Sequence, residues 1–192
     1  MSGRLPLLRP ADLEERQRSL YDSLVANEAR LFERSGVEVI ARDGGLLGPF
    51  NPLLLSPGIG AAQIGVFRAD KASTSLPPRV HEIIILTVGA AWGSEYELYA
   101  HRLVGKLVGL SQEFIEALVS GEPPDFEDAQ EASAYDFTRE LVEDQRVAPE
   151  TYAHAEQALG RRGLVDMVLL IGLYLTTCSI INAFEVPAPQ PV

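Results

Sequence analysis

The stretch from Glu82 to His101 constrains the fold of this 192-residue chain more than any other part of it. Glu82 opens an otherwise apolar run over residues 83–91, which predicts a buried helix. A second helix starting at Ser94 turns by about 100° per residue, so Ser94, Glu97 and His101 fall within an arc of about 60° that also carries apolar residues. The pattern therefore predicts two packed helices with a carboxylate and an imidazole on a buried face.

The other apolar patterns are also helical. The spacing predicts helices over residues 12–33 (capped by Asp12), 58–69, 111–119, 126–144, 149–159 and 164–184. Pro78 suits the first turn of the helix that carries Glu82, and residues 37–51 have the turn chemistry of a loop. Glycines at 160 and 163 precede the last helix. The fold class is therefore predicted to be all-α.

Composition narrows the class of protein. A net charge of −11 argues against a nucleic-acid partner and against an anionic membrane surface, both of which need clustered Lys and Arg. The apolar segment 164–184 contains Asp166 and several hydroxyl residues, so it is interpreted as a buried central helix rather than a membrane span. Cys178 is the single cysteine, and no signal peptide is recognisable at the N-terminus. We expect a soluble, cytoplasmic protein with no membrane partner.

Two interpretations of the buried polar face stay open. Ser94 and Glu97 have the spacing of a capping box, and His101 is also readable as a satisfied core histidine. Together with Glu82, however, they form a cluster of titratable groups that predicts an acid–base site. No further ligand stands at a useful spacing, so no metal is expected.

Other polar and aromatic residues carry less information. We expect His81 and His154 to lie at or near the surface, and Cys178 to be an inert buried thiol. Trp92 and Tyr96 are candidates for the core, for an interface or for ligand contact.

The combined motifs resemble the carboxymuconolactone decarboxylase family, which includes alkylhydroperoxidase D. The resemblance spans roughly residues 48–187, and its motifs are Gly48-Pro49-Phe50-Asn51, Ser56-Pro57, Glu82, Trp92-Gly93-Ser94-Glu95-Tyr96-Glu97 with His101, and Asn182-Ala183-Phe184-Glu185-Val186-Pro187. It implies that family's helical fold over residues 41–187, after an N-terminal helical extension at 1–40 and before a flexible tail at 188–192. It also implies a homotrimer or homohexamer.

The peroxidase branch of that family has a Cys-x-x-Cys pair where this chain has Ser94 and Glu97. A hydroxyl and a carboxylate cannot form a disulfide or attack a peroxide as thiolates do, so peroxidase activity is disfavoured. The decarboxylase branch is the better match. It implies a cofactor-free lyase acting on a small carboxylated lactone or related organic acid.

Within this resemblance, His101 is the expected proton donor, Glu82 orients it, and Glu97 is a second acid–base group. Candidate substrate-binding residues are Ser94, Tyr96, Trp92, Phe50 and Asn51.

The substrate that the resemblance implies requires a positively charged partner in the site. A lactone with two negative charges needs a cation, which Arg68, Arg79 or Arg102 would have to supply from outside the motif.

The alternative function is a non-enzymatic oligomeric module in which the buried polar cluster is only structural. The apolar last helix is consistent with an interface.

Overall fold

The computed structural model describes residues 3–189, which are helical apart from their connecting loops and one isolated bridge between Ile40 and Leu46. The predicted all-α class is confirmed for this range. Of the predicted flexible tail, residues 190–192 lie outside the described residues. The elements are η1 (Pro10–Asp12), α1 (Glu15–Leu24), η2 (Val25–Ala29), α2 (Arg30–Glu33), α3 (Phe50–Leu54), α4 (Pro57–Ser73), α5 (Pro78–Ala91), α6 (Glu95–Leu107), α7 (Gln112–Ser120), α8 (Ala129–Glu143) and α9 (Pro149–Ala183).

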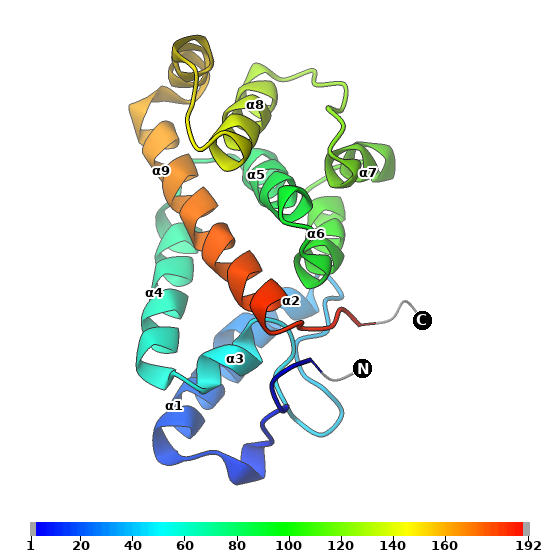
Figure 1. Ribbon diagram of the computed structural model, residues 1–192, viewed down its shortest axis with the longest axis vertical. Coiled ribbons are helices and arrows are strands. Elements are labelled where there is room, and N and C mark those ends of the chain that lie inside the picture. Colours follow the sequence, from blue (N-terminus) through cyan, green and yellow to red (C-terminus); the bar gives the residue numbers. More distant parts are fainter. Residues whose placement is uncertain (1–2, 190–192) are drawn as a thin grey trace.

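Helix α5 is the centre of the fold. Every residue from 80 to 89 is buried, because α6, α7, α8 and α9 all pack against this helix. Figure 1 shows α9 running diagonally across the molecule, with α4 along one side of it and α5 and α8 along the other. Helices α1, α2 and α3 gather at one end, beneath the C-terminal part of α9. A helix that is buried on all sides along most of its length, as α5 is, is stable only in such a surrounding.

The first long helix begins later than predicted. Asp12 belongs to the short turn η1, and α1 starts at Glu15 with Glu14 as its N-cap. The backbone N–H of Glu14 donates to the side chain of Gln17 at 3.0 Å, which forms a capping box. The predicted cap at Asp12 was therefore wrong, because a complete capping box exists two residues further along.

The predicted break before the last helix is confirmed at Gly160 but not at Gly163, because residues 161–163 are helical. Gly160 has φ of 70°, so α9 consists of two helices joined across a kink. By length and composition alone, α9 is the one helix among residues 3–189 that is able to span a membrane, with an 18-residue window of mean hydropathy 2.1. Met167, Leu170 and Ile171 of this helix pack in the main core beside α5.

The loop before α3 makes a close approach to α6. Gly48 has φ of +66°, and a Cβ atom there would overlap the ring of Tyr96. Both the backbone conformation and the contact therefore require glycine at this position.

We predict that Gly48→Ala lowers the free energy of unfolding by about 2 kcal/mol or more, because it combines an unfavourable positive φ with overpacking. Chemical denaturation followed by circular dichroism measures the change. Gly65→Ala is the matched control, since Gly65 is an exposed helical residue with open space around it. That control should stabilise the protein by about 0.5–1 kcal/mol. Equal effects of the two variants would contradict the prediction.

Candidate active site

Three predicted catalytic residues meet between α5 and α6. Gly93, with φ of 56°, ends the connection from α5 and lets α6 start directly after it. Glu82 on α5 then faces His101 on α6, and the His101 Nδ1 to Glu82 Oε2 distance is 2.6 Å. Glu97, one helical turn before His101, lies on its other side, with 3.0 Å between Nε2 and Oε1. Relative exposures of 2%, 4% and 3% for Glu82, Glu97 and His101 show that the site is removed from bulk water.

The electrostatics of this triad keep it charged. Burial alone favours the neutral ring of His101, but the charge and hydrogen bond of Glu82, together with Glu97, raise its pKa to about 9. Burial alone would also raise the pKa of Glu82, yet the charge and hydrogen bonds of its histidine neighbours lower it to about 2. At neutral pH His101 is therefore an imidazolium, whose Nδ1 donates to Glu82 and whose Nε2 forms an ion pair with Glu97.

These shifts define a window of stability. The raised pKa of His101 means that its pairing stabilises the fold fully below the usual value of 6.5, and this contribution is lost as pH rises through about 9. The lowered pKa of Glu82 means that its contribution is present above 4.5 and is lost as pH falls through about 2. Both contributions are complete between pH 4.5 and pH 6.5.

A second histidine, which the sequence interpretation placed at or near the surface, extends this network. His81 is buried, its Nε2 lies 2.8 Å from Asp70 Oδ2 on α4, and its Nδ1 lies 3.7 Å from Glu82 Oε1. The expectation for His81 was wrong, because α4 covers the start of α5 at this point. Its position next to Glu82, ahead of an apolar run, was the one signal in the sequence for its burial. His154 is exposed, as expected.

Tyr174 of α9 was also missed by the sequence interpretation. Its ring meets the ring of His101 edge to face, with centroids 5.3 Å apart. Burial, and then the negative charges of Glu97, Glu82 and Asp70, raise the pKa of its phenol well above the ordinary value, so it stays protonated.

A cavity of about 60 Å³ adjoins the triad on the side of Glu97 and His101. This volume is sufficient for several water molecules. Five elements and the loop before α3 contribute to its wall, which is mostly apolar and aromatic. The lining residues are Phe32, Val37, Val39, Pro49, Phe50, Leu53, Gln63, Ile64, Phe67, Tyr96, Glu97, Ala100, His101, Leu173, Tyr174, Thr177 and Ile180.

The predicted substrate-binding residues separate into two groups. Phe50 and Tyr96 line the cavity. Asn51 instead holds the N-terminal segment, accepting from the backbone of Leu8 and donating to the carbonyl of Pro6. Trp92 is exposed at the end of α5, outside the cavity wall.

Ser94 is fully buried but also lies outside the cavity wall. As N-cap of α6 it makes no side-chain capping hydrogen bond, so the predicted capping box is not formed. Its hydroxyl lies against Cys178, far along the chain on α9. Burial and the nearby charge of Glu97 raise the pKa of the Cys178 thiol to about 12. Such a thiol is unreactive at neutral pH, as the sequence interpretation expected.

The three arginines suggested as partners for an anionic substrate are all engaged elsewhere. Arg68 binds Glu28 at 2.7 Å, Arg79 binds Glu131 at 2.5 Å and Arg102 binds Glu116 at 3.2 Å, and none of these arginines lines the cavity. Within residues 3–189, no group of three His, Cys, Asp or Glu side chains is arranged to hold a metal ion.

Solved structures with the same arrangement of helices indicate the fold. An alkylhydroperoxidase AhpD core, an uncharacterized peroxidase-related protein from Ralstonia eutropha JMP134, superposes with a TM-score of 0.75 at 14% identity, covering 99% of this chain and 94% of that one. A protein of unknown function from Agrobacterium tumefaciens, described as a putative antioxidant defence protein AhpD, superposes with a TM-score of 0.67 at 18% identity. The match covers 73% of this chain and 97% of that one. The debrominase Bmp8 in complex with 2,3,4-tribromopyrrole superposes with a TM-score of 0.65 at 15% identity. The match covers 86% of this chain and 88% of that one.

No protein-family model and no curated protein matches the sequence. The structural likenesses nevertheless show that the chain has the AhpD-like helical fold, the fold of the carboxymuconolactone decarboxylase family. The fold predicted from the motifs is therefore confirmed.

We predict that Glu82→Gln lowers the pKa of His101 by about one unit or more, because burial then opposes the imidazolium without the charge that now offsets it. NMR titration of the His101 ring measures this directly. Glu131→Gln is the control: Glu131 is also a buried acid in an ion pair, but its partner is Arg79. An unchanged His101 pKa in Glu82→Gln would show that the pairing does not set the charge of the ring.

Proposed function

We propose that this protein is a cofactor-free lyase that decarboxylates a small carboxylated lactone or related organic acid by acid–base chemistry. The observation that carries the proposal is the placement of His101, held as an imidazolium between two carboxylates at the wall of an apolar cavity. An apolar wall also favours loss of CO₂, because a carboxylate is poorly solvated there and the departing molecule is neutral.

In the proposed reaction, the bond between the substrate carbon and its carboxylate breaks, and its electron pair moves into the adjoining carbonyl system as an enolate. The imidazolium of His101 stabilises the negative charge on the enolate oxygen. The proton on Nε2 then passes to carbon, directly or through Glu97, and gives CO₂ and the protonated product. Glu82 stays ionised and holds the ring in place, and solvent returns one proton per turnover to His101.

The peroxidase alternative has less support. It requires reactive thiols, whereas the chain has a single cysteine whose pKa is raised to about 12. The structural module remains the competing interpretation, and the cavity beside His101 favours the enzyme over it.

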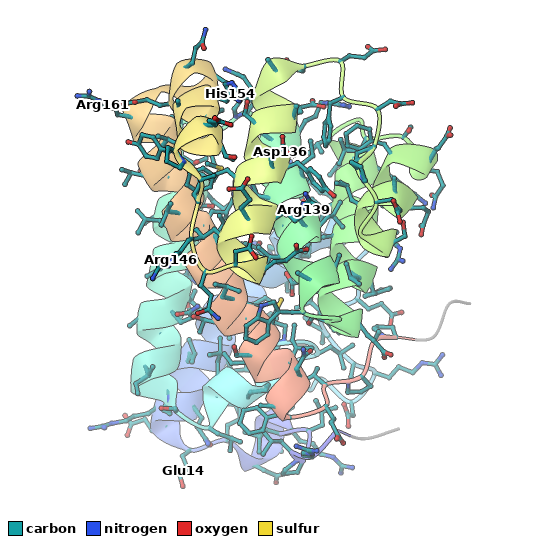
Figure 2. The ribbon with its side chains drawn as sticks, turned by 45° about the horizontal axis from the view of Figure 1, so that its top comes forward. Glu14, Asp136, Arg139, Arg146, His154 and Arg161 are labelled. Carbon is teal, nitrogen blue, oxygen red and sulfur yellow. The ribbon has the colours of Figure 1, made fainter. Side chains whose placement is uncertain are left out.

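The test is release of CO₂ from a panel of carboxylated lactones and β-keto acids by the purified protein. We expect His101→Gln to lower the rate by about 10²- to 10⁴-fold, the usual contribution of a positioned acid. His154→Gln is the control, because this histidine is exposed on the N-terminal part of α9 (Figure 2). Circular dichroism confirms folding of both variants. Absence of CO₂ release by the wild type, or equal rates in the two variants, would contradict the proposal.

We also propose that the chain assembles as a homotrimer or homohexamer through the outer face of α4 and α9, which lie side by side (Figure 1). Helix α4 buries only Gly60 and Ile64. Together with Leu55, which lies just before its start, it exposes apolar residues at spacings of four, three, four and three. The exposed apolar side chains of this face are Leu55 at the end of α3, Ile59, Ala62, Val66 and Ala69 of α4, and Val165, Val168 and Leu169 of α9. Such a stripe is typical of a helix that packs against another chain.

We predict that Ile59→Glu converts the oligomer to a monomer, because it places a charge at the most exposed of the large apolar side chains of this face. Light scattering coupled to gel filtration measures the mass. Leu107→Glu is the matched control, since Leu107 is 61% exposed on α6 and Ile59 is 75% exposed on α4. A wild-type monomer of 20.9 kDa, or dissociation of both variants, would refute this assembly.

A further inference from the structure

The wall of the cavity beside His101 contains no lysine or arginine in the part of the chain that the structure describes. Its charged members are Glu97 and His101, and Glu82 lies directly behind the imidazole. Two carboxylates and one imidazolium leave this end of the cavity with a net negative charge. An anion that enters loses its hydration and meets that charge without a cation of its own.

The guanidinium of Arg68 is held away from this wall by other partners. Arg68 follows the lining residue Phe67 on α4, but its Nε and Nη2 bind the two oxygens of Glu28 at 2.7 and 2.8 Å. Nη2 also donates to the hydroxyl of Ser23 at 2.9 Å. Because Glu28 is buried, withdrawing Arg68 would leave an uncompensated carboxylate in the core.

The uncharged polar groups of the wall are few. The hydroxyl of Tyr96 donates to the carbonyl of Glu38 at 2.9 Å, and that of Thr177 donates to the carbonyl of Leu173 at 3.0 Å. Gln63 is different, because its side-chain Nε2 is buried with no hydrogen-bond partner among the described residues. A carbonyl oxygen of a ligand would accept a hydrogen bond from this amide without bringing another negative charge into the cavity.

The aromatic rings of the wall favour an occupant with a flat apolar face, because such a face can stack on them. Phe32 packs between Phe50 and Phe67, with ring centroids 6.2 and 6.3 Å away, and Tyr174 closes the wall beside His101. Phe32, Val37 and Val39 come from the segment before α3, so the N-terminal part of the chain shapes the cavity.

We infer that this cavity selects its occupant by charge: it takes a hydrophobic, planar molecule with an uncharged carbonyl oxygen for Gln63 and at most one carboxylate, and it rejects dianions. This inference rests on the proposed function in one respect only, namely that the reacting end of the substrate lies beside His101. It narrows the substrate class from carboxylated lactones in general to those, or related keto acids, with a single negative charge.

The test is calorimetric binding of three flat aromatic probes to the full chain: acetophenone, 4-acetylbenzoate and terephthalate, with charges of 0, −1 and −2. We expect acetophenone to bind most tightly and terephthalate at least about ten-fold more weakly, because each charge adds a desolvation penalty. Tighter or equal binding of terephthalate overturns the inference, and so does failure of all three probes to bind.

Gln63→Arg supplies the missing cation at the wall. We expect it to improve the binding of terephthalate relative to acetophenone by about ten-fold or more. Ala72→Arg is the control, because Ala72 is exposed on the same helix and does not line the cavity. Should Gln63→Arg fail to fold, Glu97→Gln removes the negative charge of the wall and is expected to strengthen binding of 4-acetylbenzoate. An equal change in Ala72→Arg, or no change in Glu97→Gln, overturns the inference.

Binding and turnover separate the two proposals. A preference for acetophenone without CO₂ release from any keto acid supports the charge selection and refutes the lyase. Release of CO₂ by a protein that binds terephthalate most tightly supports the lyase and refutes the charge selection.

Discussion

The pairing of His101 with Glu82 across α5 and α6 is the interaction on which the rest of the site depends. Both groups are removed from water, and either one alone would carry a large desolvation penalty. Their 2.6 Å contact, completed by Glu97, offsets that penalty only when the two helices keep one register. The sharp turn at Gly93 permits this register, and α8 and α9 cover α5 so that water does not compete.

The chemistry of the site and the character of the cavity have the same physical origin. Low polarity around the triad strengthens the attraction between His101 and its carboxylates, which keeps the ring protonated at neutral pH. The wall also lacks a free cation, because Arg68 and Arg79 are paired with the buried acids Glu28 and Glu131. In the proposed reaction, a single imidazolium therefore has to act both as the proton donor and as the stabiliser of developing negative charge.

Helical spacing predicted the central residues of the site but not its surroundings. Glu97 and His101 are one turn apart on α6, so their shared face follows from local geometry. Asp70, Gln63 and Tyr174 come from α4 and α9, and no local pattern shows that these helices approach the same point. Trp92 and Asn51 stand in the motifs that suggested substrate contact, yet Trp92 lies at the surface and Asn51 is engaged with the N-terminal segment.

The sequence by itself determined the all-helical class, the breaks at Gly93 and Gly160, and the burial of the acid–base face, because periodicity and glycine conformation are local properties of the chain. Only the tertiary structure decided that His81 is buried against Asp70, that Ser94 meets Cys178 instead of capping α6, and that the arginines are held away from the cavity. These outcomes depend on which side chains of distant helices come within a few ångströms of each other, and that is a property of packing.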